Sequence, residues 1–600
     1  MKFNTFFRKK SVETLIADAN HENAHGGLVK SFTVTDLTLF GIAAIIGGGV
    51  FSTIGSAAYN GGTAIAVLYS GFAVACIFSA YCYARFASVV PVSGSAYTYA
   101  YTSLGEIVAW ILGWNLILEY AISNVVVAIS WSDYFTTLLE GFHIYIPEHL
   151  STGYFTARDA YLEAVAKNNA VSARTLDLRK LWETAPRIGN FPVIMDIPAL
   201  AITVAITYLV FVGIRESKNV NNVLVLLKLA AVLLVIILGA FYVKPENWVP
   251  FAPHGISGVM AGVAAVSFAY IGFDSISTTA EECKNPQKDI PKAMMYSLIV
   301  CTVLYVATVF VMTGMVSYKE LNVGDPLAYI FQKVDLNFVA GIVSVGAVIA
   351  TTSAMLAYQI GQPRIWMVMS RDGLLPKIFS NVHPKFKTPS FATLVTGAVV
   401  GIPALFVDQS YVTDLTAIGT LFAFALVCGG VLMLDQKKVA SKFKVPYVNA
   451  KFVMPILISL TFAGFFVLEK PATLDFLTFT NQRTVAAMET EIRLLSSENT
   501  ASADEKVLGL KEELDKEKSK SAGKVTGESI LKWMVLGLAL TLAYLSFTKN
   551  LSLIPVLGVM LNGYLMTTLG TENWIRFIIW CAIGFAIYFF YSFRKSKLNP

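Results

Sequence analysis

Long runs of apolar residues, separated by shorter polar connections, account for most of this chain. One membrane crossing needs about 20 apolar residues in helical conformation, and fourteen runs come near that length. They lie at approximately 36–59, 63–87, 104–139, 193–213, 221–243, 257–281, 292–316, 336–370, 390–407, 412–434, 452–468, 530–547, 551–569 and 573–593. The pattern predicts an all-α polytopic membrane protein of about 14 transmembrane helices.

Basic residues gather in alternate connections between these runs. Lysines and arginines are frequent at 371–387 and 437–444, whereas the short loops on the other side hold only Lys244, Lys319 and Lys333. Because basic residues favour cytoplasmic loops, we expect cytoplasmic tails at 1–35 and 594–600. The long polar stretches 141–192 and 471–529 then lie on the outer face.

Composition excludes several other classes of protein. The 600 residues are 55% hydrophobic and 14% charged, with a mean hydropathy of +0.61, which no ordinary soluble chain shows. The six cysteines have no CxxC spacing and the six histidines fall in polar connections. We therefore expect no metal site, no cofactor and no enzyme activity. The polar N-terminal residues lack a signal-peptide pattern and are interpreted as a cytoplasmic tail.

Two apolar runs are interrupted near their middle. The first contains Ile46-Gly47-Gly48-Gly49-Val50, and the sixth contains the segment 267–274, SFAYIGFD. A broken helix at membrane depth leaves unpaired backbone groups, which are tolerated only where protein or a water-filled cavity covers them. The breaks indicate a ligand site, although glycines that only allow close helix packing are the alternative.

The positions of the breaks predict the domain organisation. The first and sixth runs cross in opposite directions, as in two inverted repeats of five helices, here 36–243 and 257–434. Residues 452–593 add four accessory helices. The insert 471–529 between them alternates acidic and basic residues, and we expect either an outer-face helical hairpin, using Val507, Leu508, Leu510 and Leu514, or a solvated linker.

The direction of the half-helices predicts the chemistry of the ligand. The outer half of helix one would begin near Gly48 and present free N–H groups to a carboxylate. The outer half of helix six would end at 268–271 and present carbonyl groups to an ammonium group. A ligand with both groups is an α-amino acid. The substrate-binding residues expected along the breaks are Ile46, Gly47, Gly48, Gly49, Val50, Phe268, Ala269, Ile271 and Phe273.

Charged residues inside apolar runs need a function or a partner, because each costs about 2.5–3.5 kcal/mol at a helix centre. Lys228 is the candidate proton carrier, with a snorkelling interfacial lysine as the alternative. Glu119 is expected either to contact substrate or to pair with another buried charge. Asp274 is interpreted as a helix cap. Phe51 and Phe273 are candidate aromatic gates.

Six segments resemble the cationic amino acid transporter family of the amino acid-polyamine-organocation superfamily. They are LTLFGIAAIIGGGVF, YARFASVVPVSGSAYTYAY, LGEIVAWILGWNLILEY, FAYIGFDSISTTAEECKNPQKDIP, PRIWMVMSRDGLLP and NWIRFIIWCAIGFAIYFFY. The resemblance implies a LeuT-like 5+5 inverted-repeat fold, alternating access and substrate held between broken helices. It also implies that Lys228 matches the helix-five lysine of proton-coupled relatives and that Met355 lines the side-chain pocket.

Two departures from that family bear on substrate preference. Gly47-Gly48-Gly49 lacks the hydroxyl residue common at its centre, and Asn115 stands where an acidic residue is common. We therefore expect broad or neutral amino acid preference. The expected function is proton-coupled import of L-amino acids across a bacterial inner membrane. Partners are the substrate and the bilayer, without nucleic acid or metal. Alternatives are an amino acid exchanger and a membrane nutrient sensor or interaction protein.

Overall fold

The computed structural model describes most of the chain. It covers residues 7–14, 32–90, 92, 94–166, 173–212, 217–386, 388–436, 443, 445–468, 470–496, 507, 510–511, 513–515 and 517–598. Parts of both expected tails (1–6, 15–31 and 599–600), Leu508 of the insert and most of the basic loop 437–444 lie outside these residues.

Each of the fourteen apolar runs contains a described helix. In the first predicted repeat these are α2 (Val34–Ile45) with η2 (Gly49–Thr53) and α3 (Ile54–Gly61), then α4 (Ile65–Val89), α6 (Glu106–Gly141), α9 (Ile197–Val212) and α10 (Ser217–Gly239). In the second they are α11 (Gly255–Ala261), α12 (Val263–Tyr270) and η7 (Phe273–Glu282), then α13 (Pro286–Met315), α15 (Asn337–Arg371), α16 (Ser390–Ala404) and α17 (Gln409–Gln436). The accessory helices are α18 (Ala450–Leu468), α22 (Ala522–Lys549), α23 (Leu553–Thr567) and α24 (Gly570–Ile587).

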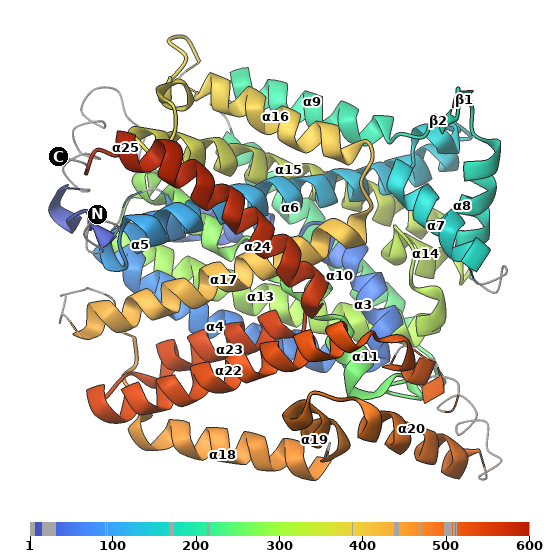
Figure 1. Cartoon of the computed structure of the whole chain (residues 1–600). Coiled ribbons are helices and arrows are strands. Elements are labelled where there is room, and N and C mark those ends of the chain that lie inside the picture. The colour runs from blue at the N-terminus through green and yellow to red at the C-terminus, as the bar shows by residue number, and fades with distance from the viewer. Residues whose placement is uncertain are drawn as a thin grey trace.

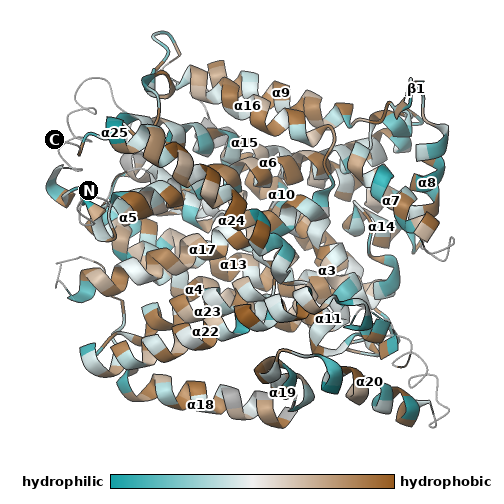
Figure 2. Cartoon of the chain, viewed as in Figure 1, coloured by the Kyte–Doolittle hydropathy of each residue, from teal (hydrophilic) through white to brown (hydrophobic). Residues whose placement is uncertain are grey.

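These helices form a bundle that is more hydrophilic at its two ends than between them. Nine helical stretches of the described chain are long and apolar enough to cross a membrane, and five shorter apolar helices accompany them. Both chain ends lie at one end of the bundle (Figure 1). Hydrophobic residues dominate the helices, and hydrophilic ones gather toward the two ends (Figure 2). This arrangement agrees with a multi-pass membrane protein whose tails share one side.

The bundle is centred on α6, the most enclosed of the candidate spans, with 94% of its apolar window buried. The last accessory helix is joined to it directly. Trp110 Nε1 donates to the carbonyl of Gly584 at 2.8 Å, and Trp114 Nε1 donates to that of Trp580 at 3.0 Å. The rings of Trp114 and Trp580 stack at 4.4 Å. α24 therefore packs firmly on α6 through these contacts, although only 22% of its apolar window is buried, as in α22.

Two polar elaborations lie at the end opposite the chain termini (Figure 1). The stretch 141–192 folds into α7 (Tyr154–Ala166), α8 (Ala173–Thr184) and an antiparallel pair, β1 (Arg187–Ile188) and β2 (Phe191–Pro192). The stretch 471–529 begins with α19 (Lys470–Thr478) and α20 (Gln482–Leu495). The outer-face helical hairpin expected for this insert stays a prediction.

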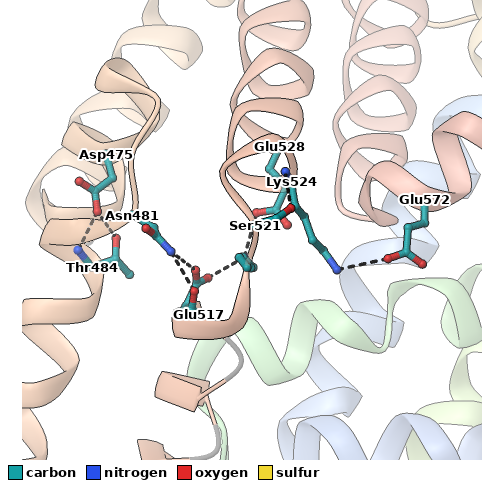
Figure 3. Close-up of polar contacts among 9 residues, drawn as sticks. Asp475, Asn481, Thr484, Glu517, Ser521, Lys524, Glu528 and Glu572 are labelled. Atoms are coloured by element: carbon teal, nitrogen blue, oxygen red, sulfur yellow. Dashed lines mark hydrogen bonds and ion pairs between the residues drawn. The ribbon is translucent and has the colours of Figure 1, made fainter.

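A buried carboxylate organises this insert (Figure 3). Asp475 accepts hydrogen bonds from the backbone N–H groups of Arg483 at 3.2 Å and Thr484 at 2.7 Å, the second and third residues of α20. It therefore caps α20 from a distance. Burial raises the pKa of Asp475, but hydrogen bonds from Thr484, Thr480 and Arg483 outweigh this effect and leave the pKa below its usual value. Asn481 Nδ2 also donates to the carbonyl of Glu517 at 2.9 Å, which joins the last part of the insert to the residue that precedes α20.

Candidate functional site

The first predicted break is present between α2 and η2. The α-helix ends at Ile45, and Ile46 has an extended backbone with φ −79° and ψ 96°. The chain resumes as one turn of π-helix, Gly49–Thr53, before α3. Wide helical turns of this kind are frequent at functional sites. Gly47, Gly48 and Gly49 therefore interrupt the helix instead of only permitting close packing within it.

The second break lies at the end of the predicted interval. α12 continues through Phe268 and Ala269 to Tyr270, and the interruption falls at Ile271 and Gly272. Gly272 adopts φ +114°, which glycine accepts without strain. The inner half continues as the 3₁₀-helix η7. Gly272 occupies the N-cap position and Asp274 lies in the first turn of η7, so the interpretation of Asp274 as a helix cap stays a prediction.

The two breaks touch each other. A Cβ atom on Gly49 would lie 2.8 Å from the Cβ of Ala269, and one on Gly272 would lie 2.8 Å from the carbonyl carbon of Ala44. The hydroxyl of Tyr305 on α13 lies within hydrogen-bond distance of both breaks, at 2.9 Å from the carbonyl oxygen of Ile45 and 2.8 Å from that of Ala269. Glycine at these positions therefore allows helices one and six to meet where both are interrupted.

Lys228 lies at this junction and is fully buried on α10. Its Nζ donates to the carbonyls of Ala43 and Ile46, both at 2.8 Å, and to Ser353 Oγ at 3.1 Å. Three acceptors match the three N–H donors of an ammonium group. Lys228 therefore donates hydrogen bonds to carbonyl groups that the first break leaves free. Because its ammonium group is buried among these acceptors, it does not snorkel to an interface.

Glu119 and Asp274 form a second buried polar group. They are 2% and 1% exposed and near enough to interact electrostatically. Three of their carboxylate oxygens, both of Glu119 and Oδ1 of Asp274, receive no hydrogen bond from the described residues. The hydroxyl of Thr420 neighbours Glu119 but donates to the carbonyl of Thr416 at 3.1 Å. Within the described chain, this pair therefore has acceptors to offer a ligand.

The remaining expected site residues surround the junction at different distances from it. Phe51 is buried in η2, 6.0 Å from the ring of Tyr134. Phe273 packs against Phe424 at 4.9 Å and against Tyr83 at 5.7 Å, on the inner side of the second break. Met355 is buried in the turn of α15 that also contains Ser353.

The sequence did not predict the hydroxyl groups that donate hydrogen bonds to backbone carbonyls of the broken helices. Besides Tyr305, Tyr358 donates to the carbonyl of Ala44 at 3.2 Å, and Thr53 donates to that of Gly49 at 3.1 Å. Tyrosines are frequent in this chain, and no spacing marks these ones. The free carbonyls of helix six are also fewer than expected, because those of Phe268 and Ala269 already accept hydrogen bonds from Ile271 N–H and Tyr305.

Comparison with known proteins identifies the class to which this architecture belongs. Residues 32–486 match the amino acid permease family, and residues 551–596 match the description of a permease C-terminus. The chain belongs to the amino acid permease family. This amino acid permease is therefore a multi-pass membrane transport protein and not an enzyme.

Several named relatives are similar over most of their length. The permease is 42% identical to the methylthioribose transporter of Bacillus subtilis over 457 residues, covering 76% of this chain and 90% of that protein. It is also 42% identical to the branched-chain amino acid permease BcaP of the same organism, covering 72% and 86%. It is 30% identical to the vacuolar cationic amino acid transporter 4 of Arabidopsis thaliana, covering 99% and 97%.

Proposed function

We propose that this permease imports L-amino acids together with protons by alternating access. The observation that carries the proposal is the contact of buried Lys228 with the carbonyls of Ala43 and Ile46. A lysine can lose its proton when it is buried, unlike an arginine. With its proton, Lys228 holds the inner half of helix one at the break. Without it, the carbonyls lose their strongest donor and helix one is free to swing away.

The substrate occupies the junction of the two breaks in this proposal. Its carboxylate accepts hydrogen bonds from the N–H groups of Gly48, Gly49 and Val50, at the positive end of the outer half-helix. Its ammonium group donates to carbonyls at the end of α12, near Tyr270 and Ile271. Binding at this place is coupled to Lys228, because both act on the same interrupted turn of helix one.

Neutral amino acids are the proposed substrate class. Two relatives at 42% identity are named for a branched-chain amino acid and for methylthioribose, neither of which carries a cationic side chain. Buried Met355 supplies apolar surface on α15, next to Ala354, whose Cβ would lie 2.8 Å from a Cβ atom on Gly47. Asn115 donates to the carbonyl of Ile111 at 2.8 Å and lies 3.8 Å from the sulfur of Cys581 on α24, so it takes no part in this preference. The Glu119 and Asp274 pair lies on the inner side of the second break in this proposal. Its negative charge allows cationic amino acids to bind as secondary substrates.

Uptake under an imposed proton gradient tests the proposal. A thermal-shift panel of the twenty amino acids, methylthioribose and polyamines first selects the ligand, because binding raises stability by RT ln(1 + [L]/Kd). Proteoliposomes then take up that ligand with the lumen alkaline, with equal pH on both sides, and with a protonophore. The proposal predicts accumulation only with the gradient. Equal counterflow in all three conditions would instead show an exchanger.

A further inference from the structure

An open apolar groove lies between α9 and α16, which run side by side at the edge of the bundle (Figure 1). We call it the α9–α16 groove. It has a volume of about 470 Å³, and its lining includes Leu200, Val204, Tyr208, Phe211, Leu394 and Ile402. Four of these side chains, on both helices, are between 55% and 66% exposed. In a membrane-embedded bundle such apolar side chains face lipid.

Close packing of the two helices forms the floor of the groove. A Cβ atom on Gly397 would lie 2.6 Å from both Cγ2 and Oγ1 of Thr207, and one on Gly401 would lie 3.0 Å from Cδ1 of Leu200. Small residues at these positions therefore let α16 lie directly against α9. Gly397 also has no side chain to fill the groove that it lines.

One end of the groove reaches the loop that precedes α16. The ring of Phe211, in the last turn of α9, lies 5.8 Å from that of His383 and 5.9 Å from that of Phe386. Thr388 Oγ1 donates to the carbonyl of Phe211 at 2.8 Å, and the carbonyl of Thr388 accepts the backbone N–H of His383 at 2.8 Å. His383, Phe386 and Thr388 are therefore tied to the end of α9.

This loop presents hydrogen-bond donors beside the apolar lining. Nδ1 of His383 accepts the backbone N–H groups of Lys385 and Phe386, both at 3.2 Å. Because Nδ1 is an acceptor, the neutral imidazole carries its proton on Nε2 and can donate it to a ligand. Lys385 is exposed, and its Nζ lies 5.4 Å from the ring centroid of Phe386.

The charge around this end of the groove is positive. Residues 373–407 contain three lysines and no aspartate or glutamate. α16 begins in the same stretch, and its N-cap Pro389 makes no side-chain capping hydrogen bond, so the first N–H groups of the helix add a positive dipole end. The stretch follows Asp372, which pairs with Lys10 at 3.0 Å and so lies at the end of the bundle that holds the chain termini.

The polar end determines which lipid the groove selects. Lipid tails are as apolar as the lining side chains, so burial of a tail alone does not distinguish one lipid from another. Basic pockets between membrane helices bind anionic headgroups. We propose that the α9–α16 groove binds one anionic phospholipid, whose acyl chain lies along both helices and whose phosphate accepts hydrogen bonds from His383 and Lys385.

Lipid titrations of the full-length protein test this proposal. The delipidated protein in uncharged detergent receives dioleoylphosphatidylglycerol, dioleoylphosphatidylcholine or glycerol 3-phosphate, and native mass spectrometry counts the bound molecules. We expect tighter binding of the phosphatidylglycerol than of the phosphatidylcholine, and no binding of glycerol 3-phosphate. Lys385→Ala and His383→Asn should each weaken phosphatidylglycerol binding about fivefold. Asparagine keeps an acceptor for the two backbone N–H groups of the loop.

A second variant blocks the apolar part of the groove. Ala398, an exposed lining residue, is replaced by tryptophan, which should weaken phosphatidylglycerol binding by at least about fivefold. As controls, Ala463→Trp adds the same ring at an exposed position of α18, and Lys549→Ala removes an exposed lysine at the end of α22. Both controls should bind the lipid as the parent does.

Several results would overturn the proposal. Equal affinity for the two phospholipids would remove the headgroup selectivity, and parental affinity in Lys385→Ala, His383→Asn or Ala398→Trp would place the lipid elsewhere. Binding of glycerol 3-phosphate as tight as that of phosphatidylglycerol would show a phosphate site without a lipid tail. A parent dimer that becomes a monomer in Ala398→Trp would assign the groove to a second copy of the chain.

Discussion

Replacing Gly49 with alanine tests the contact between the two broken helices. The added Cβ would lie 2.8 Å from the Cβ of Ala269 and closer still to its backbone, whereas ordinary contact begins near 3.4 Å. Overpacking of this kind costs about 1–3 kcal/mol. If the strain is relieved by separating helices one and six, the substrate loses its fit to both, and affinity should fall by roughly 5- to 150-fold.

Gly48 offers a matched control at the neighbouring position. A Cβ on Gly48 would meet Phe268 at 3.4 Å and Val127 at 3.5 Å, which are ordinary contacts. Equilibrium binding of the radiolabelled ligand to purified protein measures Gly49→Ala, Gly48→Ala and the parent side by side. We expect the larger loss of affinity and the larger fall in melting temperature for Gly49→Ala. Equal affinities for Gly49→Ala and the parent would refute the claim that the breaks are in contact.

Three further substitutions test the junction of the breaks, the buried carboxylate pair and the insert separately. Tyr305→Phe removes the hydroxyl that reaches both breaks. It should lower the free energy of unfolding by about 1–2 kcal/mol and weaken ligand binding. A binding curve identical to the parent's would argue against a role for Tyr305 in joining the two breaks. Glu119→Gln keeps the shape of the side chain without its charge, so neutral amino acid uptake should persist while competition by arginine disappears; loss of neutral uptake would place Glu119 at the main site. Asp475→Asn should weaken the capping of α20 by about 1–2 kcal/mol. Hydrogen exchange at residues 482–495 should become faster, and uptake should stay unchanged. Because the pKa of Asp475 lies below its usual value, the cap should be fully effective above about pH 4 and be lost as the pH falls further. If the protection of the 482–495 amides, relative to their intrinsic exchange rates, is the same above and below this pH, the prediction is wrong. Reduced uptake by Asp475→Asn would instead show that the insert takes part in function, as the alternative of a membrane nutrient sensor requires.

The helices and the breaks could be predicted because their causes are local in sequence. Apolar runs of membrane-spanning length each contain a helix in the structure, and three consecutive glycines mark the first interruption. Lys228 was also recognisable, since a lysine in an apolar run needs partners. The inverted 5+5 repeat and the number of crossings remain predictions.

What could not be predicted depends on contacts between distant segments. Tyr305 reaches Ile45 across 260 positions, and Tyr588 reaches Glu106 across 482. Neither tyrosine differs in its sequence neighbourhood from those that only pack. The exact position of the second break was also hidden, because the segment 267–274 offers several residues at which a helix can end, and Gly272 is selected by its fit against Ala44.

Proton movement into proteoliposomes shows whether Lys228 couples amino acid import to the proton. Proteoliposomes loaded with a pH-sensitive dye receive external amino acid at equal pH on both sides, and lumen acidification is recorded for the parent, Lys228→Met and Lys532→Met. Lys532 is an exposed lysine of α22 and serves as the control. We expect substrate-dependent acidification in the parent and in Lys532→Met. We expect none in Lys228→Met, although that variant still binds the amino acid. Undiminished acidification in Lys228→Met would contradict the mechanism.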